Sequence, residues 1–353
     1  MKVDAATETD IVSVSSEVDA TTETEYEFPP VVYEAEINQL QREMEALKIE
    51  IEPLRIHPFG FFSIKDDNNA CMYYTGIEID IFLLLGEVCA TVYDKLSSYD
   101  GNKVHILSFR DQLLLVFMKL RLNSDFVDLA QRFGISRTLA YRIFRTVLPA
   151  LHIVVFKAFM DEIPSPRKIR QSLPLCFDSF SNCRLVIDST EMRCQSPSHF
   201  REQKATYSSY KHFTSVKVTI GILPSGTVVA CTPCYPGSTS DKAIVKHSNF
   251  FKHLKSGDLI LADKCFLVHE LLPAGVSLNI PPFLARKQFT PTEVTETRNI
   301  AKARIHIERF NVRLKNWRIT QLIPYTTFKY VSIIVQTCVG LVNFKNPLLR
   351  EIA

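Results

Sequence analysis

The sequence predicts an α/β layered domain preceded by a small all-helical domain. Two observations support this prediction: residues 108–160 carry only helical patterns, whereas strand-like and helix-like segments alternate from residue 183 onwards. A basic, proline-rich segment at residues 164–174 separates the two parts and is typical of a linker between domains. We therefore expect a domain boundary near residue 165.

The length and composition are those of a globular intracellular protein. With 353 residues, of which 46% are hydrophobic, the chain can bury a full core. Its apolar runs are shorter than the roughly 20 residues that a membrane-spanning helix needs, so no membrane partner is expected. Asp4, Glu8 and Asp10 stand where a secretory signal would place basic and then apolar residues. The nine cysteines are therefore expected to be reduced thiols.

The formal net charge of +3 conceals a division of charge along the chain. Residues 1–52 hold 14 acidic and 3 basic side chains, so the other 301 residues hold 24 acidic and 38 basic ones. This excess of 14 positive charges suits a polyanionic partner, because each phosphate contact releases counterions. Basic bodies also occur in proteins that bind no nucleic acid, so the charge alone leaves the partner open.

The chain begins with an acidic tail and one amphipathic helix. Residues 1–32 hold few large apolar side chains, so we expect them to be disordered. Residues 33–56 carry a short heptad seam with Pro53 near its end, formed by Ile37, Leu40, Met44, Leu47, Ile51 and Leu54. This helix either packs on its own domain, which the sequence favours, or pairs with a second copy of the chain as a homodimer.

The helical region contains the pattern of a helix-turn-helix at residues 126–144. Ser108 can cap the preceding helix, and Ser136 can cap the second helix of the motif. Gly134 supplies a tight turn between the two helices of the motif, and Pro149 marks a break in the series of helices. A plain helical hairpin has the same apolar spacing. The interpretation of this motif as DNA-binding depends on four side chains that can contact base edges and phosphates: Arg137, Thr138, Tyr141 and Arg142.

Strands are predicted beyond the linker at residues 183–189, 215–223, 227–234 and 258–262. Helices are predicted at residues 240–254, 292–318 and 325–342. Asp188 ends the first of these strands and Asp263 ends the last, so both carboxylates should lie at carboxyl ends of strands, where α/β folds place their ligands. Asp241 opens the helix that lies between them, where it is a metal ligand or a capping residue.

The helix predicted from residue 292 contributes a third carboxylate. Arg304, Glu308 and Lys315 share one face, which places a carboxylate between two cations. A surface ion-pair ladder has the same spacing. Together with the two strand aspartates, however, Glu308 suits a site for two divalent cations, Mg²⁺ or Mn²⁺, that acts on phosphate esters.

Several motifs in this part of the chain are similar to the DDE superfamily endonuclease domain of PIF/Harbinger-type transposases. They are residues 186–191 (VIDSTE), 205–211 (ATYSSYK), 235–242 (YPGSTSDK), 262–266 (ADKCF) and 278–283 (LNIPPF), with the Arg304, Glu308 and Lys315 spacing. Residues 107–151 resemble the helix-turn-helix that precedes that domain. The resemblance implies a ribonuclease H-like mixed sheet with flanking helices.

The resemblance also implies roles for individual residues. Asp188, Asp241, Asp263 and Glu308 would be the metal-binding carboxylates, and Asp188, Asp263 and Glu308 the catalytic ones. For the second catalytic aspartate the family offers both Asp241 and Asp263, and the strand pattern favours Asp263. Arg304 and Lys315 would neutralise phosphate charge. The expected partner is DNA, in the nucleus, with a separate DNA-binding partner protein as a further expectation.

The expected organisation has six parts: an acidic tail (1–32), a heptad helix (33–56), a connecting region (57–106), a helix-turn-helix domain (107–163), a linker (164–182) and the endonuclease domain (183–346). Cys265 stands where the family has glycine, so a turn that needs positive φ would be strained beside Asp263. The alternative to a nuclease is therefore a domesticated DNA-binding or scaffold protein that kept the fold and lost catalysis.

Overall fold

The computed structural model describes residues 30–51, 59–100, 106–160, 162–264, 266–282, 288 and 290–347. The chain divides into two compact units, with the boundary between His57 and Pro58. Residues 1–29 of the predicted acidic tail (1–32) lie outside the described residues. The same is true of Pro53, Leu54 and Cys265.

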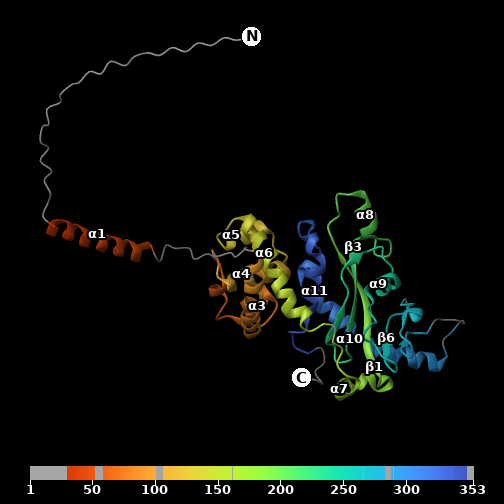
Figure 1. The fold of residues 1–353 in the computed structure, drawn as a ribbon. Helices are drawn as coiled ribbons and strands as arrows, with labels where there is room; N and C mark the ends of the chain where they lie inside the picture. The colour runs from red at the N-terminus through yellow and green to blue at the C-terminus, as the bar shows by residue number, and fades with distance from the viewer. Residues whose placement is uncertain are drawn as a thin grey trace, which may run out of the picture. The chain divides into compact units, whose positions relative to one another are not determined.

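The first unit contains one described helix, α1 (Pro30–Ile51), drawn in red in Figure 1. It covers most of the predicted heptad segment and begins three residues earlier. Its apolar seam is exposed, with exposed fractions of 53% for Ile37, 58% for Leu40, 53% for Met44 and 55% for Leu47. Glu, Gln and Lys separate these positions, so α1 carries an unburied apolar stripe along a polar helix.

The second unit begins with a body of helices. It contains α2 (Asn68–Thr75), α3 (Ile79–Asp100), α4 (Phe109–Leu122), α5 (Phe126–Arg132) and α6 (Arg137–His152). Residues 59–100, for which the sequence predicted no particular structure, form α2 and α3, which contribute Cys71, Phe82 and Cys89 to the same core as α4. Helix α4 is the centre of this body, because all its residues from Gln112 to Leu120 are buried.

The helix-turn-helix prediction is confirmed at three of its local signals, Ser108, Gly134 and Ser136. The side chain of Ser108 caps α4, and Ser136 caps α6 by accepting a hydrogen bond from the amide of Leu139 at 3.2 Å. Gly134 has a φ of +63°, which a side chain would disfavour. Pro149 does not end the helix: α6 runs through it and continues as a π-helical turn, Ile153–Lys157.

The sheet follows in the α/β domain (Figure 1). Its strands are β1 (Cys183–Arg193), β2 (Tyr207–Ser208), β3 (Phe213–Ile222), β4 (Val228–Cys231), β5 (Tyr235–Pro236), β6 (Leu259–Leu261) and β7 (Ser277–Asn279). The central order is β3-β1-β6-β7, with β3 antiparallel to β1 and with β6 and β7 parallel to it. This mixed sheet with flanking helices is the expected ribonuclease H-like architecture.

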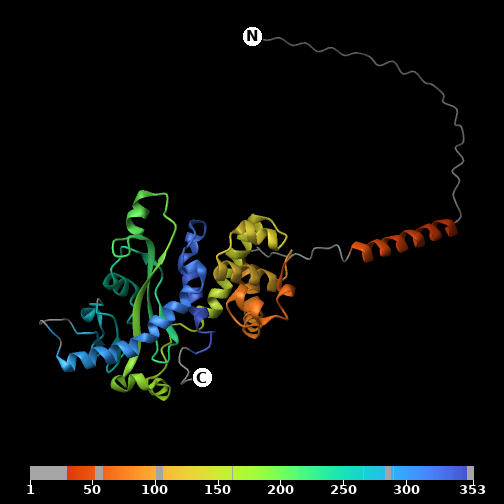
Figure 2. The ribbon, with the colours of Figure 1, turned by 180° about the vertical axis from the view of Figure 1, so that it is seen from behind.

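Helices cover both faces of the sheet. Helix α10 (Pro291–Lys315) crosses the face seen in Figure 2, where Ile307 and Phe310 belong to one buried cluster with Val186 of β1. Helix α9 (Asp241–Ser248) lies on the other face, where Val245 packs in a second cluster with Leu185 and Ile187. Because side chains alternate along a strand, Asp188 faces α10 with Val186, whereas Ser189 and Glu191 face α9.

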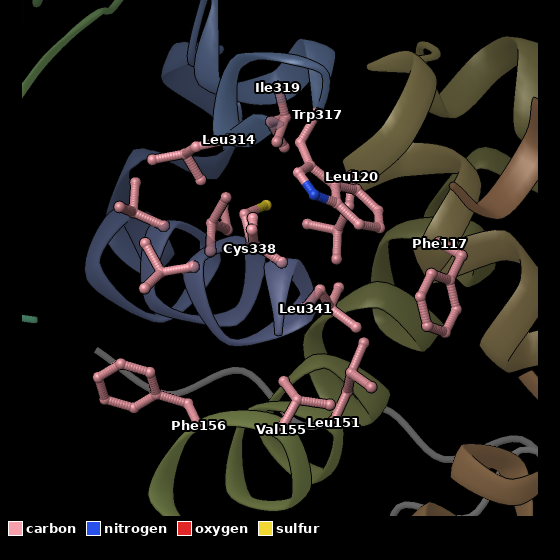
Figure 3. Packing of buried hydrophobic residues seen from close by; sticks show 14 of the residues in the cluster. Phe117, Leu120, Leu151, Val155, Phe156, Leu314, Trp317, Ile319, Cys338 and Leu341 are labelled. Atoms are coloured by element: carbon pink, nitrogen blue, oxygen red, sulfur yellow. The ribbon is translucent and has the colours of Figure 1, made fainter. Parts of the chain in front are cut away.

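One core joins the helical body to the sheet. Helix α11 (Val331–Val342) packs between α6 and the sheet, so its buried residues share a cluster with both. Figure 3 shows this junction, where Trp317 and Cys338 meet Leu120 of α4 and Leu151 of α6. The helical body and the sheet are therefore packed as parts of one unit.

The predicted linker and one predicted strand end differ from the structure. Residues 166–171 form α7 (Pro166–Gln171), and a 3-10 helix follows at Leu175–Phe180, with Ile169, Phe177 and Phe180 buried. The segment is packed against the domain because these apolar side chains anchor it. Strand β1 continues five residues beyond Asp188, so Asp188 lies inside a strand and not at its end.

Two helical segments are long and apolar enough to span a membrane by length and composition, Arg137–Lys157 and Tyr325–Val342. In their most apolar windows, 61% and 50% of the residues are buried inside the protein. Both contribute to the shared core, which explains their apolar character without a bilayer.

Candidate active site

The strand register brings the two aspartates side by side. Strands β1 and β6 are parallel, and Val186 is paired with Leu261. Asp188 lies two residues beyond Val186, and Asp263 lies two residues beyond Leu261. Neighbouring parallel strands that continue in the same register place such residues at the same level of the sheet. Asp263 follows the end of β6 as the sequence predicted, whereas Asp188 projects from the middle of β1.

Glu308 joins this pair through Arg304, one turn earlier on α10. Arg304 Nη1 donates to Asp263 Oδ1 at 3.1 Å, and Arg304 Nη2 lies 3.9 Å from Glu308 Oε1. The Arg304 side chain is only 13% exposed, compared with 48% for Asp263 and 61% for Glu308. Arg304 is therefore a largely enclosed guanidinium that links two of the three predicted catalytic carboxylates.

Asp188 is the most enclosed of the three carboxylates. Burial, followed by repulsion from Glu308, raises the pKa of Asp188 to about 6. A hydrogen bond of 2.8 Å from Asn311 Nδ2 and the charge of Arg304 act in the opposite direction without cancelling these effects. The three carboxylates therefore share one electrostatic environment, in which negative charge exceeds the positive charge that the chain supplies.

The donor atoms suit a hard divalent cation. All three groups offer carboxylate oxygens, and the buried Oδ1 of Asn311, next to Asp188, has no hydrogen-bond partner in the described part of the chain. As they stand, no three His, Cys, Asp or Glu side chains among the described residues are close enough to form a metal centre. The guanidinium of Arg304 supplies positive charge between Asp263 and Glu308, so binding of a cation there requires Arg304 to move aside.

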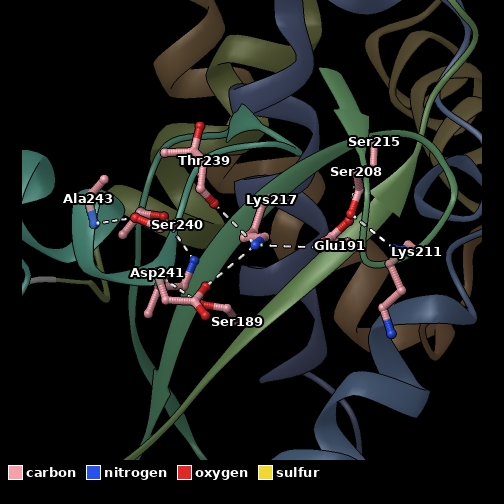
Figure 4. Close-up of polar contacts among 12 residues, drawn as sticks. Ser189, Glu191, Ser208, Lys211, Ser215, Lys217, Thr239, Ser240, Asp241 and Ala243 are labelled. Atoms are coloured by element: carbon pink, nitrogen blue, oxygen red, sulfur yellow. Dashed lines mark hydrogen bonds and ion pairs between the residues drawn. The ribbon is translucent and has the colours of Figure 1, made fainter. Parts of the chain in front are cut away.

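Asp241 does not lie with these carboxylates. It is the first residue of α9, on the other face of the sheet, and Ser240 is the capping residue of that helix. Figure 4 shows Lys217 of β3 between Asp241 and Glu191, with its Nζ 3.7 Å from Asp241 Oδ1 and 3.4 Å from Glu191 Oε1. Asp241 thus belongs to a separate network of two carboxylates and one ammonium group, in which Ser215 also donates to Glu191 at 2.8 Å.

The predicted DNA-contacting residues are only partly exposed. Arg137 and Thr138 at the start of α6 are exposed, but Tyr141 and Arg142 are half-buried. The ring of Tyr141 packs edge-on against Phe126 with centroids 5.3 Å apart, so it contributes to packing within the motif. Lys315 is exposed at the end of α10, one turn beyond Asn311 on the face that carries Arg304 and Glu308.

Two residues of these sites were missed in the sequence. Asn311 lies three residues after Glu308, so its helical spacing alone could have placed it on the same face. Arg145 is exposed one turn beyond Arg142 on α6 and extends the basic face of that helix. The turn at Cys265 lies outside the described residues, so the strain expected there stays a prediction.

Comparisons with known proteins match two parts of the second unit. A family model for the DDE superfamily endonuclease matches residues 187–343, and a model for the helix-turn-helix of DDE superfamily endonucleases matches residues 105–156. Comparisons with curated proteins and with solved structures found no match. The first model covers the sheet with Asp188, Asp263 and Glu308, and the second covers α4 to α6. The chain therefore carries a DDE superfamily endonuclease domain preceded by the helix-turn-helix of that family.

Proposed function

We propose that this protein is a metal-dependent DNA endonuclease of the PIF/Harbinger transposase type. The observation that carries the proposal is the convergence of Asp188, Asp263 and Glu308 around Arg304 and Asn311. These residues come from β1, the end of β6 and α10, which are far apart in sequence. Convergence of remote acidic side chains in a partly buried site is expected for phosphodiester chemistry and unusual for a surface ion-pair ladder.

Asp188, Asp263 and Glu308 are the proposed ligands of the Mg²⁺ or Mn²⁺ ions. When bound, two divalent cations would activate the attacking oxygen and stabilise the leaving oxygen of the phosphodiester. Asn311 holds the carboxylate of Asp188 in place through its amide hydrogen bond. Arg304, released from Asp263 and Glu308 by the cations, would pair with the phosphate of the substrate, and Lys315 lies on the same helical face for the same purpose.

DNA is the proposed partner of the helix-turn-helix. Arg137, Thr138 and Arg145 are exposed on α6, where a helix placed in a major groove would present them to bases and phosphates. From the resemblance to PIF/Harbinger-type transposases, we further propose residence in the nucleus and cooperation with a separate DNA-binding protein. Imaging of the tagged full chain and affinity capture with a DNA-contact variant as control would test both.

The apolar seam of α1 is suited to pairing with a second copy of the chain. Two such helices could bury Ile37, Leu40, Met44 and Leu47 against each other, because the four positions follow a heptad spacing. We therefore propose a homodimer through α1 as an accessory property of the nuclease. It does not depend on catalysis.

The test is metal-dependent cleavage of DNA. The full-length chain should nick a DNA duplex that carries the ends of the corresponding element, in Mg²⁺ or Mn²⁺ but not in EDTA. Asp188→Asn, Asp263→Asn and Glu308→Gln should each lose activity, whereas Asp66→Asn, at an aspartate whose side chain is 87% exposed, should retain it. Calorimetry with Mn²⁺ should show binding by the wild type and weaker binding by Asp188→Asn.

The opposite results would favour a different function. A wild-type chain that binds DNA but neither binds Mn²⁺ at millimolar concentration nor cuts under any metal would be the domesticated DNA-binding or scaffold protein. Activity that persists unchanged in Asp188→Asn would mean that another site performs the cleavage.

A further inference from the structure

A cavity lies where the helical body meets the carboxyl end of α10 and the residues that follow α11. It has a volume of about 220 Å³ and is lined by the α2–α3 turn, the end of α10 and the residues that follow α11. Its polar lining consists of Glu78, Arg313, Asn316, Lys345 and Asn346. None of these residues is part of the carboxylate site or of the helix-turn-helix surface.

Three cations surround this cavity. Arg313 and Lys345 line it directly. Arg121 of α4 lies beside the lining residue Gly76, because a Cβ placed on Gly76 would be 3.0 Å from Arg121 Cδ. Glu78 is the one carboxylate in the lining. Within the described part of the chain, none of the three cations forms an ion pair with Glu78 or any other carboxylate, so their charges are not balanced by close contacts.

The two arginines have structural contacts that explain part of their presence. Arg121 donates to the carbonyl of Asn316 at the end of α10, and Arg313 donates to the carbonyls of Asn346 and Pro347. Such contacts satisfy carbonyl groups near helix ends. They use only part of the five donors of each guanidinium, so both arginines retain N–H groups for a ligand.

The contact of Lys345 is of a different kind, with an aromatic ring. Its side chain makes no hydrogen bond or ion pair with any residue that the structure describes, and its Nζ lies 5.4 Å from the centre of the Trp317 ring. Burial, followed by repulsion from Arg121 and Arg313, lowers the pKa of Lys345 to about 8. A half-buried ammonium group held beside two other cations is costly to the free protein, and an anion in the cavity would offset that cost.

The cavity shares one lining residue, Arg313, with a cavity beside the carboxylate site. Arg313 lines a second, more open cavity together with Glu308, Arg309 and Val312. A phosphate held by Arg313 and Lys345 would therefore lie about one to two helical turns from Glu308. A DNA backbone that passes the carboxylates could continue into this cavity, and a free phosphorylated molecule could enter it from solvent.

We infer that the cavity between Gly76, Arg313 and Lys345 is a binding site for a phosphate group, distinct from the carboxylate site. Arg121 and Arg313 supply guanidinium donors, Lys345 supplies an ammonium group that has no carboxylate or hydrogen-bond partner among the described residues, and Asn316 supplies neutral hydrogen bonds. The site does not require a divalent metal or cleavage. It would persist in a chain whose carboxylates bind no metal.

Trp317 provides a direct probe of occupancy, because it is the only tryptophan in the chain and lies against Lys345. The full-length chain is titrated with inorganic phosphate at constant ionic strength, with chloride as the reference anion, and tryptophan emission is followed. Phosphate should change the emission saturably. Lys345→Gln and Arg313→Gln should weaken the binding about tenfold each, whereas Lys255→Gln, an exposed lysine elsewhere, should not.

The second arm identifies the source of the phosphate. Fluorescence anisotropy measures the affinity of the same variants for a DNA duplex at several salt concentrations. If the ligand is the DNA backbone, Lys345→Gln and Arg313→Gln each reduce the salt slope by about one and inorganic phosphate competes with DNA. If the ligand is a free phosphorylated molecule, phosphate binding is lost in both variants while DNA affinity and slope stay at the wild-type values.

Folding is checked by thermal unfolding of each variant. Lys345→Gln should be at least as stable as the wild type, because it removes a desolvated charge. The inference is overturned if wild-type emission does not respond to phosphate and the DNA salt slope matches that of Lys255→Gln in both variants. It is equally overturned if every response persists in Lys345→Gln. Neither result bears on cleavage, which is tested separately with Asp188→Asn.

Discussion

Asn311 Nδ2 donates a hydrogen bond of 2.8 Å to Asp188 Oδ2, across 123 residues of sequence. Asn311 also keeps its buried Oδ1 free of any partner among the described residues. The amide therefore orients the carboxylate of Asp188 with its nitrogen and offers an oxygen to the same small space. This dual arrangement makes Asn311 a positioning residue for the proposed cation site.

Replacing Asn311 should weaken the cation site without unfolding the protein. Asn311→Ala is expected to lower Mn²⁺ affinity and nicking activity by about 10- to 100-fold, because Asp188 loses the donor that fixes its orientation. Calorimetry and a nicking assay measure the two effects. Asn299→Ala on the same helix is the matched control and should behave as the wild type. If both variants bind Mn²⁺ with equal affinity, Asn311 does not contribute to the cation site.

Asp188 should make the metal-free protein less stable at neutral pH. Its pKa is raised from 3.8 to about 6, so the fold disfavours the ionised form relative to the unfolded chain. The destabilisation is fully present above pH 6 and is relieved as the pH falls through 6 towards 4. In EDTA, Asp188→Asn should therefore be more stable than the wild type by about 2 kcal/mol at pH 7.5.

Thermal unfolding between pH 4 and 7.5 measures this difference. The two proteins should approach equal stability near pH 4, and millimolar Mn²⁺ should stabilise the wild type more than the variant. Asp66→Asn, at an exposed position, should follow the wild type throughout. A stability difference that is independent of pH would show that the ionisation of Asp188 is not its cause.

Close packing of α11 on the π-helical turn makes Gly340 sensitive to any side chain. A Cβ at Gly340 would lie 2.2 Å from the backbone oxygen of Val155, so the two segments would have to separate. Gly340→Ala should destabilise the protein by about 1–3 kcal/mol in urea unfolding. Gly86→Ala, inside α3 with its nearest contact at 3.7 Å, should instead be neutral or stabilising by up to about 1 kcal/mol.

The exposed seam of α1 predicts concentration-dependent dimers. Leu40→Glu combined with Leu47→Glu should shift the chain to monomers in light scattering, because two buried charges would face each other across the pair. Gln39→Glu combined with Ala46→Glu places the same charges off the seam and should leave the dimer intact. If the wild type is monomeric at every concentration, the apolar seam of α1 does not mediate dimerisation and contacts another surface.

Local signals in the sequence predicted the helical motif well. Ser108, Gly134 and Ser136 act through contacts within a few residues, so their roles do not depend on the rest of the fold. The α/β architecture was also predictable, because strand and helix patterns alternate along the chain. The proline and basic residues of residues 164–174 indicated a linker between domains, but Ile169, Phe177 and Phe180 pack this part of the chain against the domain.

The candidate site was predictable only in part, since its geometry is set by tertiary contacts. Asp188 was expected at the end of a strand because the apolar run stops there, yet β1 continues through Thr190 and Met192, whose side chains are buried. Asp241 and Asp263 have similar local contexts in sequence. The strand pattern favoured Asp263, and the ion pair of Asp241 with Lys217 on the opposite face adds a tertiary contact that the sequence does not show.

The shared core of α6, α11 and the sheet has a consequence for where cutting would occur. Because α6 and α10 are held by the same packed side chains, the recognition helix and the carboxylates cannot rotate independently of each other. A nuclease with this structure would cleave the DNA at a fixed number of base pairs from the sequence that it binds. Within one subunit, the distance between the bound sequence and the cleaved bond would therefore be fixed by the structure of the protein.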